Sequence, residues 1–92
     1  MAICIEFRLI EVNATIARYQ YGQCMKELDG TFEVDIPKLI SGEISKDTPM
    51  DEVVRLLPSK YMNQSMANRA FSKIYKYYLE NKGYPSEGGY YA

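Results

Sequence analysis

The sequence contains no histidine. Histidine is the commonest general base and the commonest metal ligand in proteins, so its absence argues against most acid–base catalysis and most metal sites. Cys4 and Cys24 have neither the CxxC spacing nor the further ligands of a structural zinc site. Phosphate-binding glycine motifs and the G-x-S-x-G motif of hydrolases are absent too. We therefore expect no metal, no cofactor and no enzymatic activity.

An excess of charge of one sign and long apolar runs are also lacking. The 11 basic and 12 acidic residues leave a net charge of −1, which gives no field to attract nucleic acid or anionic lipid. Without a run of about 18 apolar residues, no membrane-spanning helix is expected. Glu6 and Arg8 interrupt the apolar N-terminal segment, which argues against a signal peptide. These features predict a cytoplasmic protein whose cysteines stay reduced.

The strongest pattern that is present is helical and covers residues 61–82. At 3.6 residues per turn, its apolar face comprises Met66, Ala67, Ala70, Phe71, Ile74, Tyr77 and Tyr78. The opposite face comprises Arg69, Ser72, Lys73, Lys76 and Glu80. Because an isolated helix of this length is marginal in water, the apolar face must pack against another element. Gly83 and Pro85 are expected to end the helix.

The N-terminal third of the chain predicts a hairpin. Residues 3–12 and 16–23 alternate apolar and polar side chains with a period of two, which is typical of half-buried strands. A three-residue loop over residues 13–15 keeps the apolar side chains of both strands on one face. The pairs that this loop predicts are Val12 with Ile16, Leu9 with Tyr19, Phe7 with Tyr21 and Cys4 with Cys24.

A third strand is predicted over residues 31–36, after the turn dipeptide Asp29-Gly30. The pairs expected with the second strand are Tyr21 with Phe32, Tyr19 with Val34, Ala17 with Ile36, Arg18 with Asp35 and Gln20 with Glu33. The charged pair would contribute a few tenths of a kcal/mol. Pro37 either ends this strand or confines it to a sheet edge, and residues 43–45 are a candidate for a short fourth strand.

A short helix is predicted from Pro49 to about Leu57, with Thr48 as its capping residue. We therefore expect residues 1–92 to form a single α+β domain. Its three- or four-stranded antiparallel sheet would be an N-terminal meander packed by the long C-terminal helix, with the short helix before it. Residues 84–92 would form a tail of tyrosine and glycine.

Three segments combine into a pattern: FRLIEV at residues 7–12, ARYQY at residues 17–21 and GYPSEGGYYA at residues 83–92. Together they resemble a group of small uncharacterised bacterial proteins. That group has two such strands and a C-terminal helix, followed by aromatic-Pro-x-x-Gly and a terminal aromatic residue. The resemblance covers about half of the chain, and residues 45–65 depart from it by adding helical material. It implies the same sheet-plus-helix fold and no particular activity.

Tyrosine is unusually frequent, with nine in 92 residues. Because tyrosine has an apolar ring and a polar hydroxyl, it suits half-buried positions and interfaces. We expect Tyr84 and at least one of Tyr90 and Tyr91 to pack on a surface. That surface would belong to a second copy or to the open side of this sheet, beside Ile10, Val12 and Ile16.

The chain is therefore predicted to be a protein-interaction module that binds a protein partner or a second copy of itself. The alternative is a nucleic-acid-associated accessory protein that contacts phosphates with the basic stripe Arg69, Lys73 and Lys76. Glu80 lies four residues after Lys76 and can pair with it, which is typical of a solvated helix face. Nucleic acid is the less favoured partner.

One pair of carboxylates has a spacing that occurs in glycosidases. Glu33 and Asp35, two apart on a strand, would lie about 6–7 Å from each other on one face. An acidic face neutralised by Arg18 and Arg8 is the better interpretation, because nothing there predicts the raised pKa of a general acid.

The two cysteines, if they face each other, are candidates for a redox pair. Neither Cys4 nor Cys24 has a nearby cation or helix N-terminus in the predicted fold that would stabilise a thiolate. Inert, small apolar side chains are therefore the favoured interpretation.

Overall fold

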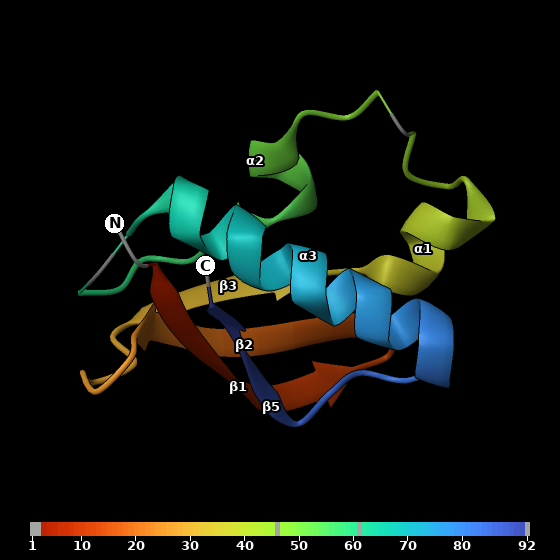
Figure 1. Cartoon of the computed structure of the whole chain (residues 1–92). Helices are drawn as coiled ribbons and strands as arrows, with labels where there is room; N and C mark the ends of the chain where they lie inside the picture. The colour runs from red at the N-terminus through yellow and green to blue at the C-terminus, as the bar shows by residue number, and fades with distance from the viewer. Residues whose placement is uncertain (1–2, 46, 61, 92) are drawn as a thin grey trace.

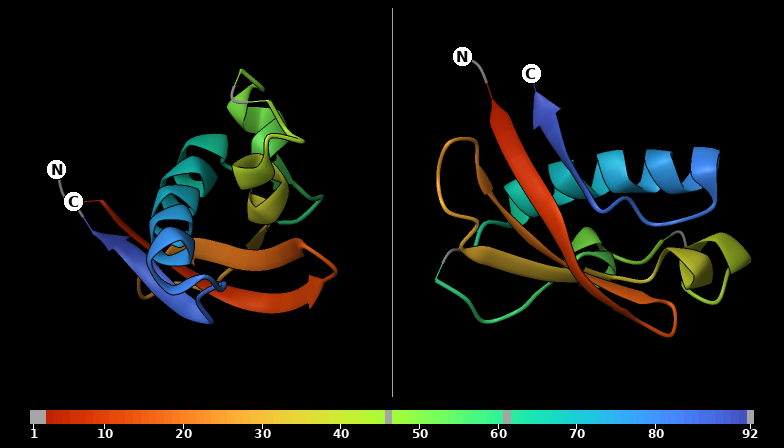
Figure 2. Two further views of the ribbon diagram at one scale, coloured as in Figure 1. Left: turned by 90° about the vertical axis from the view of Figure 1, so that its right-hand side faces the viewer. Right: turned by 90° about the horizontal axis from the view of Figure 1, so that it is seen from below.

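The computed structural model describes residues 3–45, 47–60 and 62–91. Within these residues, five antiparallel strands form one sheet in the order β4-β3-β2-β1-β5, and the helices lie on one side of it (Figures 1 and 2). The elements are β1 (Cys4–Asn13), β2 (Ile16–Gln23), β3 (Gly30–Val34), α1 (Ile36–Ser41), α2 (Met50–Val53), β4 (Arg55–Leu56), α3 (Gln64–Asn81) and β5 (Glu87–Tyr91). The α+β class is confirmed, but the sheet has five strands rather than three or four.

Helix α3 follows the helical pattern of its sequence and buries the face that the pattern predicts. Its buried side chains are Met66, Ala67, Ala70, Phe71 and Ile74. Tyr78 is half-buried, whereas Tyr77, predicted on the apolar face, is 43% exposed. The long C-terminal helix packed on the sheet is thus confirmed, with a narrower apolar face than expected.

The ends of α3 are defined by side-chain and backbone caps. Asn63 precedes the helix and its side chain accepts a hydrogen bond from the amide of Met66 at 3.0 Å. Lys82 takes a left-handed conformation with φ 56° and ends the helix one residue before Gly83. The predicted start at Tyr61 lies outside the described residues.

The core lies between the sheet and α3. Its largest fully buried side chains are Tyr19, Tyr21, Phe32, Ile5, Ile36, Ile74, Val34 and Val54. They come from the inward-facing positions of the strands, from the segments that follow β3 and α2, and, for Ile74, from α3. Full burial of one such side chain contributes about 1.5–3 kcal/mol, so these residues hold the helix on the sheet.

Strands β1 and β2 pair with the predicted register over most of their length. The confirmed pairs are Leu9 with Tyr19 and Phe7 with Tyr21. Nearer the turn, a β-bulge at Ile10 shifts the register by one residue, so Val12 faces Ala17 rather than Ile16. The predicted three-residue loop is wrong, because Asn13 pairs directly with Ile16. The extra residue expected in the loop lies in the bulge instead.

Strand β3 is displaced by two residues from the register predicted for it on β2. The observed pairs are Ala17 with Val34, Arg18 with Glu33, Tyr19 with Phe32, Gln20 with Thr31 and Tyr21 with Gly30. The predicted pairs of Tyr21 with Phe32, Tyr19 with Val34, Ala17 with Ile36, Arg18 with Asp35 and Gln20 with Glu33 are wrong. A shift by two residues leaves every side chain on its predicted face, so the buried set is unchanged while the charged partner changes.

The segment after β3 forms α1, which the sequence pattern did not predict. Asp35 caps this helix by accepting a hydrogen bond from the amide of Lys38 at 3.1 Å. Pro37 lies in the first turn, where its missing N–H is not needed. The strand therefore ends before Pro37, as expected, but residues 43–45 form no strand.

The predicted helix from Pro49 to Leu57 is shorter than expected. It spans Met50–Val53 only, and no side chain caps it, so the capping role predicted for Thr48 is wrong. The chain then enters β4, which pairs with β3 and places Leu56 opposite Phe32. A short helix before α3 is confirmed.

Cys4 and Cys24 form a disulfide, with their Cα atoms 5.3 Å apart. The amide of Cys24 also donates to the carbonyl of Cys4 at 3.1 Å. Their predicted pairing is thus confirmed, but the expectation of reduced, inert thiols is wrong. Disulfides persist in oxidising compartments, so the cysteines give no support to the cytoplasmic location, which stays a prediction. In the described part of the chain, no helix has the length and apolarity needed to cross a bilayer.

Candidate functional site

Residues 87–91, predicted as part of an irregular tail, form the edge strand β5 beside β1 (Figure 2). The pairs are Cys4 with Tyr91, Ile5 with Tyr90, Glu6 with Gly89, Phe7 with Gly88 and Arg8 with Glu87. The strand contains two adjacent glycines, a residue type that is depleted in strands. This composition hid β5 from the sequence pattern.

The hydrogen-bond pattern shows which backbone groups of β5 face away from the sheet. The amide of Leu9 donates to the carbonyl of Ser86 at 2.8 Å. Because hydrogen-bonded and non-hydrogen-bonded pairs alternate in an antiparallel ladder, Gly88 and Tyr90 also bond toward β1. The N–H and C=O groups of Glu87, Gly89 and Tyr91 therefore point outward. Within the described residues, no other strand lies on that side of β5.

The two edge strands of the sheet differ in length and in the features that block addition of a further strand. At one edge, β4 has only two residues, Arg55 and Leu56. At the other edge, β5 has five residues with no lysine, proline or bulge. Short strands, charged side chains (lysine above all), proline and bulges are features by which proteins block strand addition at an edge. With Glu87 as its one charged residue, the β5 edge is the longer and less protected of the two.

The side chains of β5 divide between the two faces of the sheet. Tyr90 is half-buried against the core on the helix side, where the Lys73 ammonium lies 5.6 Å from the centre of its ring. Tyr91 lies on the outer face and is 68% exposed. A Cβ atom on Gly89 would clash with the Tyr91 ring, so the ring covers this glycine. The edge thus carries one packed and one exposed tyrosine.

Tyr84, predicted as an interaction residue, joins two distant segments of the domain through its hydroxyl. Its hydroxyl donates to the carbonyl of Thr15 at 2.7 Å and accepts from the amide of Ile36 at 3.0 Å. Burial raises its pKa to about 12. Tyr84 and Tyr90 do pack on the domain, but they contact the core on the helix side rather than the open side of the sheet, where packing was expected.

Two further tyrosine hydroxyls join distant segments. The Tyr19 hydroxyl donates to the carbonyl of Pro85 at 2.6 Å, and burial raises its pKa above its ordinary value. The Tyr21 hydroxyl accepts from the amide of Asn63 at 3.0 Å, next to the start of α3. Much of the tyrosine content therefore serves the fold rather than a binding surface.

Within one chain, the predicted docking of the terminal tyrosines beside Ile10, Val12 and Ile16 is wrong, whereas docking on this region of a second copy stays a prediction. Ile10 and Val12 are 47% exposed and Ile16 is 36% exposed, near the β1–β2 turn. Tyr91 pairs with Cys4 at the other end of β1, about 20 Å from Ile10 at roughly 3.3 Å per residue. The structure therefore does not bring these isoleucine and valine side chains together with the terminal tyrosines.

The basic stripe Arg69, Lys73 and Lys76 lies on α3, which runs over β1 and β5. Lys73 contacts Tyr90 of β5. Arg69 lines a surface cavity of about 390 Å³ together with Cys4 and Ile5 of β1. The described residues contain no ion pair between Lys76 and Glu80, so that prediction is wrong. Among the described residues, none of the three basic side chains of the stripe forms an ion pair with a carboxylate, and Lys73 lies beside β5.

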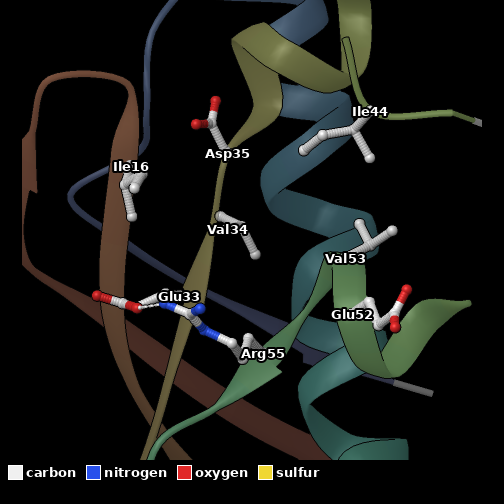
Figure 3. Close-up of a pocket in the computed structure, with 8 residues that line it drawn as sticks. All are labelled: Ile16, Glu33, Val34, Asp35, Ile44, Glu52, Val53 and Arg55. Carbon is white, nitrogen blue, oxygen red and sulfur yellow. Dashed lines mark hydrogen bonds and ion pairs between the residues drawn. The ribbon is translucent and has the colours of Figure 1, made fainter. Parts of the chain in front are cut away.

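The carboxylates of Glu33 and Asp35 belong to separate networks beside a cavity of about 140 Å³ (Figure 3). Glu33 binds Arg55 at 2.6 Å and Arg18 at 3.0 Å. Hydrogen bonds from Arg55, and then from Arg18, hold the pKa of Glu33 below its usual value. A general acid needs the opposite shift.

Asp35 accepts hydrogen bonds from the Thr15 hydroxyl and the Lys38 amide, at 2.7 and 3.1 Å. The expected neutralisation is confirmed in part: Arg18 and Arg55, rather than Arg18 and Arg8, pair with Glu33. Asp35 has no arginine partner in the described residues and lies 3.9 Å from the Lys38 ammonium. Among the described residues, no cluster of three or more potential metal-ligating side chains is present.

No protein-family model matches the chain, and neither a curated protein nor a solved structure matches it. The resemblance to small uncharacterised bacterial proteins stays a prediction. Function is therefore inferred from the geometry of the molecule alone.

Proposed function

We propose that this protein is a non-enzymatic protein-interaction module that binds an extended segment at the free edge of β5. The observation that carries the proposal is the row of outward backbone groups on Glu87, Gly89 and Tyr91. An added strand would form main-chain hydrogen bonds with these groups, as in other cases of β-augmentation. The exposed Tyr91 ring would supply apolar contact on the outer face.

Strand β5 is held in a fixed position before any partner binds. Tyr90 is packed on the core, and the segment before β5 is tied to β2 through Pro85 and Tyr19. A rigid edge loses less conformational entropy on binding than a mobile tail does. The partner can be another protein or a second copy of the chain, and the two are distinguished by mass in solution.

A proline substitution at an outward position tests strand addition directly. Glu87→Pro removes one outward N–H, whereas the bonds of β5 to β1 run through Ser86, Gly88 and Tyr90. Glu87→Ala is the matched control, since it also removes the carboxylate but keeps the N–H. A ten-residue peptide of alternating threonine and glutamine serves as a neutral extended probe.

Strand addition predicts that this peptide shifts the NMR signals of Glu87, Gly89 and Tyr91, and that Glu87→Pro weakens binding while Glu87→Ala does not. Light scattering on the peptide-free protein reports self-association, and a dimer abolished only by Glu87→Pro would make the partner a second copy. Equal behaviour of both variants, without shifts along β5, would refute the proposal.

A further inference from the structure

The basic side chains of α3 lie beside the same edge that offers the outward backbone groups. Lys73 is placed over Tyr90, and Arg69, one turn earlier on α3, borders the cavity next to Cys4 and Ile5. Neither forms an ion pair with a carboxylate of the described residues. Positive charge is therefore concentrated on the helix side of the β5 edge.

An additional strand at this edge would place every second side chain on that helix side. Neighbouring strands lie about 4.8 Å apart, and residues opposite Gly88 and Tyr90 would point toward α3. A carboxylate at such a position comes within reach of the Lys73 ammonium. The nearby acidic residue of β5, Glu87, lies in register with Arg8 and faces the opposite side of the sheet, so it does not offset this attraction.

We infer that the segment bound at β5 is an extended stretch of a partner protein with acidic side chains at alternate positions, recognised by Lys73 and Arg69. This inference rests on the proposed strand addition. It assigns the basic stripe to the same site as the edge strand. Main-chain hydrogen bonds hold the segment, and the charges of α3 select its sequence.

A second copy of the chain fits the site less well. Two copies joined antiparallel through β5 are related by a two-fold axis normal to the sheet, which puts both α3 helices on the same face. Their basic stripes would then lie next to each other across the junction. Like charges brought together in this way oppose association, whereas an acidic segment is attracted.

Three synthetic ten-residue peptides test the inference on the full chain. Threonine alternates with glutamate in the first, with glutamine in the second and with lysine in the third. Each exposed charge pair changes affinity by a factor of about two to five. We therefore expect the glutamate peptide to bind about three- to tenfold more tightly than the glutamine peptide, and the lysine peptide to bind most weakly.

Variants of the basic side chains identify the residues responsible. The double change Arg69→Gln and Lys73→Gln should remove the preference for the glutamate peptide while leaving the affinity for the glutamine peptide unchanged. Lys73→Arg should retain the preference, because it keeps the charge. Lys38→Gln, at a lysine on α1, is the matched control and should change nothing.

The possible outcomes separate this inference from the proposed function. Equal affinity for all three peptides, with NMR shifts at Gly89 and Tyr91, would overturn the acidic preference and leave strand addition standing. Absence of shifts along β5 with every peptide would overturn both.

A single-stranded DNA of random sequence is the last probe. If the double variant abolishes its binding and Glu87→Pro does not, the stripe binds nucleic acid and the inference is wrong.

Discussion

The hydroxyl of Tyr84 donates a hydrogen bond to the carbonyl of Thr15 at 2.7 Å, across 69 residues of sequence. The same oxygen accepts from the amide of Ile36, the first residue of α1. One side chain thus joins the segment before β5 to the β1–β2 turn and to the end of β3. This contact explains how a segment of small and polar residues reaches a defined position at the sheet edge.

Replacing Tyr84 by phenylalanine should lower the free energy of unfolding by about 1–3 kcal/mol, because two buried backbone groups lose their partner. Urea unfolding measures this change. Tyr77→Phe is the control, since Tyr77 is 43% exposed, and it should change stability by less than about 0.5 kcal/mol. Equal effects of the two substitutions would show that the Tyr84 hydroxyl does not hold these segments.

Stability should fall in alkaline solution as the buried tyrosines ionise. Burial, with smaller contributions from the Asp35 carboxylate and Tyr78, raises the pKa of Tyr84 from 10.0 to about 12. The folded state thus holds this proton more tightly than the unfolded state does. Its contribution to stability is complete below pH 10 and is lost as the pH rises toward 12.

Urea midpoints measured across this alkaline range should fall more steeply for the natural chain than for Tyr84→Phe. Burial also raises the pKa of Tyr19, so the variant should retain part of the decline. A pH dependence identical in both proteins would contradict the role of Tyr84 in it.

Truncation of Phe71 to alanine should destabilise the protein by about 3–5 kcal/mol. Phe71 is buried at the centre of the inward face of α3, and its ring is tilted against that of Tyr75 with the ring centres 5.6 Å apart. The exposed Leu79 of the same helix is the comparison, and Leu79→Ala should cost less than about 1 kcal/mol. Chemical unfolding of both variants checks whether α3 docks through the face described above.

Loss of the disulfide should destabilise the fold without changing its strand pairing. Cys4 and Cys24 are 20 residues apart, and closing a loop of that size stabilises by about 3 kcal/mol in the chain-entropy model. The double change Cys4→Ser and Cys24→Ser should lower the unfolding free energy by that amount. Oxidised and reduced protein that unfold at the same urea concentration would contradict the prediction.

The periodicity of the sequence was sufficient to predict those parts of the fold that involve a single helix or a single strand. The inward face of α3 and the alternation along β1 and β2 follow from spacing alone. The pairing of Leu9 with Tyr19 was also predictable, because a shift by one residue would have mixed the apolar and polar faces. The charged pairing of Arg18 with Glu33 was missed, since a shift by two residues preserves both faces.

The candidate site was predictable only in its parts. The sequence drew attention to Tyr90, Tyr91 and the stripe of Arg69, Lys73 and Lys76 as separate features. Their proximity depends on the path of the chain after α3, which places β5 along β1 and under the helix. The residues of β5 have little strand preference of their own, so their conformation is decided by the neighbour with which they pair.

The amino-acid sequence by itself thus determined the α+β class, the long amphipathic helix and the faces of the first strands, because side-chain periodicity records which face is buried. Tertiary structure alone decided the bulge at Ile10, the bonding of the paired Cys4 and Cys24 as a disulfide, and the fifth strand. The fifth strand depends on which segments, distant in sequence, come together. That choice follows from the summed packing of the whole core, with Tyr84 as one of its links, and local patterns do not record it.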